Sequence, residues 1–293
     1  MVLLLALITV LSWGIWLFPA HGAAMKSQRV VVFYVTLANL LVSAAMTGLK
    51  PAGQSVDASV WIAIAVGGVC WTLSGACAFG ATARLGPARA MGVWSPLNIL
   101  VSLGWGCVLF GEFAGLDSDR LCLTVLSVAA LVAGLLIVIR PDRSATGTKP
   151  ASRSGLLMAV GAGALWGSYF LPIRWSGTDP ATAVLPMAVG MFAAAGIILL
   201  ATRTSWRLAA GGDYLRLPLS GALWSAGNFG SLALMERVGT GRGFSIAQLC
   251  LVVNAIVGIF FLRTPSPGSP AAHRVLIGCS LATVGGITLG FTR

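Results

Sequence analysis

The chain has 293 residues, of which 57 % are hydrophobic and 9 % are charged, with a mean hydropathy of +0.90 and a formal net charge of +11. A soluble domain has about 45–50 % apolar and about 25 % charged residues, so this composition excludes an ordinary cytosolic enzyme, a disordered chain and a coiled coil. The positive charges lie between apolar blocks rather than along one helix face. That distribution argues against a nucleic-acid partner and is typical of loops beside anionic lipid headgroups.

Ten apolar blocks follow one another along the chain, and each is long enough to cross a bilayer, whose hydrocarbon needs about 20 helical residues. Regular alternation of apolar and polar residues is absent from the blocks, which excludes a membrane β-barrel and leaves helices as the spanning elements. We therefore predict an all-α membrane protein with ten transmembrane helices. The expected blocks are 2–20, 29–49, 59–82, 89–110, 121–140, 154–172, 181–201, 217–235, 243–262 and 274–292.

The second half of the chain repeats the first at a constant offset of 153 residues. The offset predicts a first five-helix repeat at 1–140, a polar linker at 141–153 and a second five-helix repeat at 154–293, all in one membrane domain. Because five is odd, the second repeat enters the membrane from the opposite side, as in the inverted-topology repeats of secondary transporters. The matched residues include Trp13 with Trp166, Pro19 with Pro172, Trp71 with Trp224, Gly86 with Gly239, Arg89 with Arg242, and Arg140 with Arg293.

The repeat also bears on whether the first block is a signal peptide and on which side of the membrane the termini lie. The first block has a counterpart at 154–172, so we interpret it as a retained helix rather than a signal peptide. With ten helices, 13 of the 19 Lys and Arg residues fall in loops on the side without the termini. The positive-inside rule then predicts that both termini lie outside the cytoplasm. The other side carries Lys50, Arg120, Arg174, Arg237, Arg242 and Arg293.

Charged side chains are absent from the predicted helix centres. Glu112 and Glu236 lie at the ends of the fourth and eighth blocks, where carboxylates are usually solvated, and we keep them as candidates for coupling transport to protons. No metal-ligand cluster, nucleophile motif or phosphate-binding loop appears, and the six cysteines form no CxxC pair. We therefore expect no enzyme activity, no metal and no cofactor.

Aromatic side chains and amides occupy equivalent places in the two repeats. Trp13 and Trp16 share one face of the first block and are matched by an aromatic pair in the sixth, and Ser95 and Asn98 share a face of the fourth. Sugars stack their apolar faces on aromatic rings and bond their hydroxyls to amides, so we predict a site for a neutral polyhydroxylated ligand between the repeats. The alternative is that the tryptophans form interfacial belts and the amides join helices. The predicted substrate-binding residues are Trp13, Trp16, Trp71, Asn98, Trp166, Tyr169, Trp224, Asn228, Gln248 and Asn254.

A run of small residues in the eighth block carries the clearest family resemblance. Residues 221–229 read Gly-Ala-Leu-Trp-Ser-Ala-Gly-Asn-Phe, and the likeness continues through 244–249, 258–262 and 285–290. Phe110-Gly111-Glu112 at the end of the fourth block fits it as well. The whole chain resembles the drug/metabolite transporter superfamily and, within it, the glucose/ribose porter family of bacterial sugar uptake proteins. Such proteins close the ninth helix with a similar Gly-Glu, whereas this chain reads Arg263-Thr264-Pro265-Ser266.

The resemblance implies ten helices in an inverted five-plus-five repeat, uptake of sugars or related small metabolites that is often coupled to protons, and a place in the bacterial inner membrane; facilitated diffusion is the alternative to proton coupling. It also implies cytoplasmic termini, the opposite of what the charge distribution predicts. We therefore expect a secondary transporter that moves a monosaccharide or sugar derivative by alternating access. An exporter of amino acids or drugs on the same fold, and a non-transporting membrane sensor or assembly factor, are the alternatives. The expected partners are a sugar-like small molecule and the lipid bilayer. Whether the chain also forms a homo-oligomer is left open by the sequence.

Overall fold

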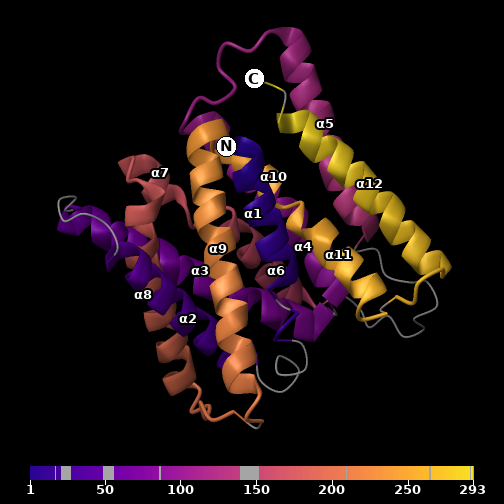
Figure 1. Cartoon of the computed structure of the whole chain (residues 1–293). Coiled ribbons are helices and arrows are strands. Elements are labelled where there is room, and N and C mark those ends of the chain that lie inside the picture. The colour runs from indigo at the N-terminus through magenta and orange to yellow at the C-terminus, as the bar shows by residue number, and fades with distance from the viewer. Residues whose placement is uncertain are drawn as a thin grey trace.

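The computed structural model describes residues 1–16, 18–20, 28–48, 56–85, 87–138, 152–208, 210–263, 265–290 and 292. These described residues form helices and connecting turns without a strand, which confirms the all-helical fold (Figure 1). The helices are α1 (Val2–Ile15), α2 (Gln28–Gly48), α3 (Ala58–Leu85), α4 (Pro87–Val108), α5 (Ser118–Val138), α6 (Arg153–Trp166), α7 (Leu171–Ser176), α8 (Pro180–Ala201), α9 (Asp213–Val238), α10 (Thr240–Ala247), α11 (Cys250–Phe260) and α12 (Pro270–Gly290).

Seven helical segments of the described chain are long and apolar enough to cross a membrane. They are the single helices α2, α3, α5, α8 and α12 and the consecutive pairs α6–α7 and α10–α11. α1 and the part of α4 from Val93 to Val108 are shorter apolar helices, and α9 has charged residues in its first and last turns. Large apolar side chains such as Leu157, Leu200 and Ile277 stay exposed, as expected of a surface that faces lipid. The chain is therefore an integral membrane protein.

Two of the predicted blocks contain a break. α6 ends at Trp166, and α7 begins at Leu171 after a four-residue turn. α10 ends at Ala247, and α11 begins at Cys250 after a turn of two residues. The blocks at 154–172 and 243–262 are therefore each two helices in series, which their apolar composition did not indicate.

Helices from the two halves of the chain pack against one another. α3 contacts α6 and α8, α9 contacts α1 and α2, α4 contacts α6 and α10, and α5 lies along α12 (Figure 1). The main cluster of buried apolar residues lies among α2, α3, α8, α9 and α10. A second cluster joins α4, α5, α11 and α12.

The start of α1 and the end of α12 lie at the same end of the bundle, which we call the terminal end (Figure 1). The connection from α4 to α5 lies at this end as well (Figure 1). The predicted linker 141–153 falls outside the described residues except for Ser152 and Arg153. Arg140 and Arg293 also lie outside them.

The crossing of α3 and α8 depends on glycine. A β-carbon at Gly190 of α8 would overlap the carbonyl group of Ala65 on α3, so the two backbones are in direct contact there. Small residues at such points let helices approach closely in lipid, where the hydrophobic effect does not drive helices together.

Gly190→Ala is expected to lower the free energy of unfolding by about 1–3 kcal/mol, because the added methyl group must push two packed backbones apart. Gly196→Ala on the same helix is the control, since nothing lies within 4 Å of a β-carbon at that position. The control is expected to be neutral or slightly stabilising, because alanine is the better helix former. Melting temperatures of the purified variants in detergent measure both effects, and equal values would contradict the tight crossing.

Candidate functional site

Three tryptophans from three helices meet inside the bundle. The Trp224 ring of α9 stacks on that of Trp13 from α1, with centroids 6.4 Å apart, and lies 4.5 Å from the Trp71 ring of α3. The Trp13 indole N–H also donates a hydrogen bond to the Trp224 carbonyl oxygen at 3.3 Å. The offset-matched residues Trp71 and Trp224 are therefore in contact, and Trp13 completes the cluster.

The glycines of the 221–229 run explain how α9 accepts these neighbours. A β-carbon at Gly227 would overlap the Trp13 ring, and one at Gly221 would lie 2.6 Å from the β-carbon of Ala38 on α2. The run therefore marks the points where α1 and α2 rest on α9. Its conspicuous spacing serves the packing that places Trp13 beside Trp224.

Tyr169 lies buried in the turn between α6 and α7. Its hydroxyl donates to the Asn228 side-chain oxygen on α9 at 3.4 Å, and its ring centroid lies 6.4 Å from that of Phe244 on α10. Phe170, which is fully buried, lies 5.2 Å from the same Phe244 ring. The break in one discontinuous helix therefore packs against the other, an arrangement from which transporters build substrate sites.

Four buried polar atoms of α4 and α6 have no hydrogen-bond partner among the described residues: Trp94 Nε1, Ser95 Oγ and Asn98 Oδ1 of α4 and Trp166 Nε1 of α6. We call these four atoms the polar face of α4, because three of them lie on that helix and the ring of Trp166 contacts Trp94. The rings of Trp94 and Trp166 meet edge to face, with centroids 4.9 Å apart. The offset-matched residues Trp13 and Trp166 therefore have different aromatic neighbours: Trp224 for Trp13 and Trp94 for Trp166.

Buried polar groups in folded proteins are nearly always paired, and each one left unpaired costs about 1–3 kcal/mol. The polar face of α4 offers two N–H donors, one carbonyl acceptor and one hydroxyl that can do both. A ligand that carries several hydroxyl groups has the complementary set. Asn98 and Trp166 were among the predicted substrate-binding residues, whereas Trp94 and Ser95, which have unpaired buried atoms as well, were not.

The remaining predicted residues have different surroundings. Gln248 occupies the turn between α10 and α11 and is 6 % exposed. Asn254 donates from Nδ2 to the Gly14 carbonyl oxygen at 3.3 Å, so this amide joins α11 to α1. Trp16 is partly buried just after α1, and its carbonyl oxygen accepts a hydrogen bond from the Ser220 hydroxyl.

The two carboxylates kept as coupling candidates differ in their contacts. Glu112 is partly buried, and its carboxylate accepts hydrogen bonds from the backbone N–H groups of Thr240 and Gly241 at the start of α10. Glu236 is exposed in the last turn of α9. Both carboxylates interact electrostatically with Arg174 of α7. Glu112 is therefore held by the protein rather than free in solvent at the end of its helix.

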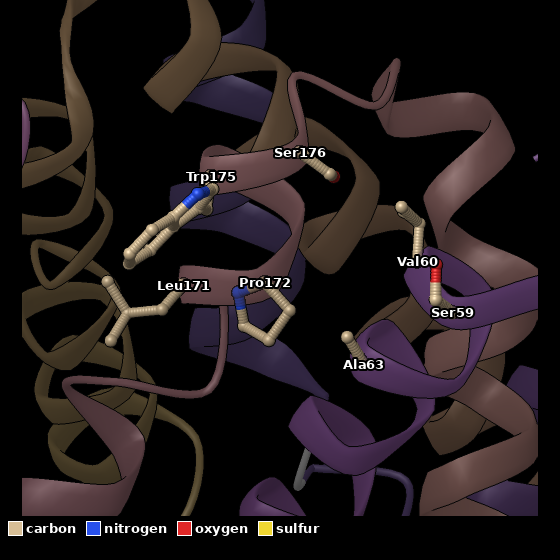
Figure 2. Close-up of a pocket in the computed structure, with 7 residues that line it drawn as sticks. All are labelled: Ser59, Val60, Ala63, Leu171, Pro172, Trp175 and Ser176. Atoms are coloured by element: carbon tan, nitrogen blue, oxygen red, sulfur yellow. The ribbon is translucent and has the colours of Figure 1, made fainter. Parts of the chain in front are cut away.

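A cavity of about 410 Å³ lies between α3 and α7, and none of the predicted site residues lines it. Figure 2 shows Ser59, Val60 and Ala63 of α3 across from Leu171, Pro172 and Trp175 of α7. Its lining is almost entirely apolar, and the Ser176 hydroxyl already donates to the Ile173 carbonyl oxygen. This cavity therefore offers a sugar few hydrogen-bond partners.

Comparison with a solved structure supports the fold. A crystal structure that is 16 % identical in sequence superposes with a TM-score of 0.73, covering 98 % of this chain and 95 % of that one. A likeness at this level of identity concerns the arrangement of the helices alone.

Comparison of sequences gives the family. The pattern of the family described as sugar transport protein matches residues 4–292. A Bacillus cereus protein provisionally named as a sugar uptake protein is 25 % identical over 302 residues, which cover 99 % of each chain. The glucose uptake protein GlcU of Bacillus subtilis is 25 % identical over 295 residues, which cover 99 % of this chain and 98 % of GlcU.

The fold and these matches define a membrane transport protein. The chain belongs to the sugar transport protein family. It is a sugar transporter and not an enzyme, and the resemblance to bacterial sugar uptake proteins is confirmed.

Tyr169→Phe is expected to lower the free energy of unfolding by about 1 kcal/mol, because the Asn228 side-chain oxygen loses a buried donor while the ring contacts remain. Thermal unfolding in detergent measures the change. Tyr214→Phe is the matched control: its hydroxyl accepts a hydrogen bond from the Leu208 backbone N–H at an exposed position, where water can replace the lost acceptor. A melting temperature of Tyr169→Phe equal to that of the unchanged protein would show that the hydroxyl does not hold Asn228.

Proposed function

We propose that this transporter binds a monosaccharide or sugar derivative inside the bundle, between the polar face of α4 and the aromatic cluster around Trp224. The observation that carries the proposal is the polar face itself, whose four buried atoms have no partner among the described residues. Hydroxyl groups of a sugar would satisfy these atoms, while the aromatic rings would cover its apolar faces. The names of the two relatives, sugar uptake and glucose uptake, support a monosaccharide and the inward direction.

The proposed mechanism is alternating access between two inverted repeats of five crossings each. The helix contacts support it: exchanging each helix with its counterpart 153 residues away turns the α3–α6 and α3–α8 contacts into α9–α1 and α9–α2 contacts, which are all present. Ser220 bonds to the Trp16 carbonyl, and its counterpart Gly67 approaches the carbonyl of Tyr169, the counterpart of Trp16. An even number of crossings also agrees with chain ends that share the terminal end (Figure 1).

The proposal includes a place in the inner membrane of a bacterial cell, with both termini outside the cytoplasm as the loop charges predict. It also includes proton coupling through Glu112 or Glu236. The interaction of both carboxylates with Arg174 supports this choice, because a change in the charge of either one is felt by the same guanidinium group.

Uptake of labelled monosaccharides into proteoliposomes tests the proposed function. The expected result is saturable uptake that unlabelled sugar inhibits and that an inward proton gradient accelerates. Labelled amino acids and cationic dyes are the comparison cargoes, and liposomes without protein are the control. Preferential transport of amino acids or dyes would contradict the sugar site.

Asn98 and Asn254 provide a matched pair of variants for the site. Asn98→Leu removes an amide whose oxygen has no partner among the described residues, so stability is expected to stay the same or rise while sugar affinity falls by roughly 5- to 150-fold. Asn254→Leu breaks the bond to Gly14 and is expected to lower stability with a smaller effect on affinity. Sugar binding by calorimetry and melting in detergent give the two readouts. An Asn98→Leu protein that melts lower and binds sugar normally would refute the placement of the site.

A further inference from the structure

The carboxylate of Glu112 joins the connection after α4 to the first turn of α10. It accepts hydrogen bonds from the backbone N–H groups of Thr240 and Gly241, the second of them at 3.0 Å. The first N–H groups of a helix have no partner within the helix and carry a partial positive charge, so a carboxylate is a strong acceptor for them. We call this carboxylate and its two N–H donors the Glu112 latch.

Glycine makes this approach sterically feasible. Gly239, which precedes α10, has φ +98°, and a β-carbon there would lie 2.8 Å from the carboxyl carbon of Glu112. A β-carbon at Gly106 of α4 would lie 2.7 Å from Oε2 of the same carboxylate. The carboxylate therefore sits between two positions that only glycine can occupy without displacing it.

Side chains around the latch tie it to α7 and to the rest of the connection. The Arg174 guanidinium donates to the Thr240 hydroxyl at 3.0 Å and lies 5.8 Å from the centroid of the Phe110 ring. The Arg242 guanidinium lies 5.1 Å from the centroid of the Phe113 ring. Cations over aromatic faces are attracted to them, so both arginines reinforce the contact between the connection and α10.

The elements that the latch joins are those that carry the interior aromatic groups. α10 bears Phe244, which meets Tyr169 and Phe170 just before α7. Gln248 follows directly at the end of α10. A displacement of the α10 start would therefore be transmitted to the region where the sugar is proposed to bind.

The sequence does not repeat the latch at the matching positions of the other repeat. The offset of 153 residues places Pro265 at the counterpart of Glu112, so the carboxylate is missing there. Pro87 is the counterpart of Thr240 and Ala88 that of Gly241, so one N–H donor and one glycine are missing as well. In an inverted repeat these counterparts belong to the opposite end of the transport path.

We propose that Glu112 is a positioning residue that holds the terminal end of the transport path closed, and that the latch opens when the transporter changes its accessible side. The proposal rests on the alternating-access function described above. Because the opposite end lacks the matching carboxylate, the protein without sugar stays mainly in the state that is closed at the terminal end. Sugar binding supplies the contacts that offset the loss of the latch.

Distance measurement between spin labels tests the proposal on the full chain in lipid nanodiscs without sugar. Cysteines that replace Ala114, in the connection after α4, and Arg237, at the end of α9, carry the labels in a background without the six native cysteines; both positions are exposed. The unchanged latch is expected to give one main short distance. Glu112→Gln is expected to add a second, longer distance, with the ratio of open to closed protein raised by roughly 10- to 100-fold.

Thr240→Pro is the second variant, because proline is tolerated in the first turn of a helix and removes the N–H group that Glu112 accepts, together with the hydroxyl that accepts from Arg174. It is expected to produce the same longer distance. Asp117→Asn is the matched control, since this exposed carboxylate in the same connection bonds to Arg120 instead of α10. The control is expected to keep the single short distance.

Unchanged distances in both Glu112→Gln and Thr240→Pro would overturn the proposal. A lower melting temperature without a second discrete distance would overturn it too, because it would give Glu112 a purely structural role. The measurement needs no sugar. Failure of the unchanged protein to transport sugar would therefore refute the proposed function alone, and the distances would still decide the role of the latch.

Discussion

A backbone N–H or carbonyl group in lipid must find its partner inside the protein, and this requirement determines most of the architecture. It accounts for the helices, and it also restricts where a helix can break. The turn between α6 and α7 contains Phe170, which is fully buried, and the turn between α10 and α11 contains Gln248, which is 6 % exposed. Both breaks are thus enclosed by other helices, where their freed backbone groups are away from lipid. The breaks within these two spanning segments consequently lie in the interior of the bundle.

The interior has two kinds of polar group. Trp13 and Asn254 use their donors to join α1 to α9 and α11 to α1, and Tyr169 joins the turn between α6 and α7 to α9. The polar face of α4 keeps its hydrogen-bonding capacity unused within the described chain. The paired groups hold the helices together, and under the proposed function the unpaired groups of α4 and α6 are available to a ligand.

The helical membrane fold and one of its interior contacts could be predicted from the sequence, whereas the substrate site stays a prediction. Composition was sufficient for a helical membrane protein, and the offset of 153 residues matches Trp71 with Trp224, whose rings are in contact. Trp94, which belongs to the proposed site, was not predicted because its offset counterpart is Ala247, although its spacing of four residues from Asn98 places both on one helix face. The partner of Glu112 could not be predicted, because backbone N–H groups 128 and 129 residues away carry no side-chain signal. The break before α11 likewise lacks the proline or glycine that usually marks one.

The shortness of α10 has a mechanical consequence. Eight residues make a rigid rod of about 12 Å, given a rise of about 1.5 Å per residue, and the two-residue turn after it separates the rod from α11. A rotation of about 20° around that turn would carry the far end of the rod through roughly 4 Å, from the same rise. Side chains next to the pivot would move by a fraction of that. If α10 pivots at this turn, a small repacking around Gln248 would become a larger displacement of Thr240 at the terminal end of the bundle.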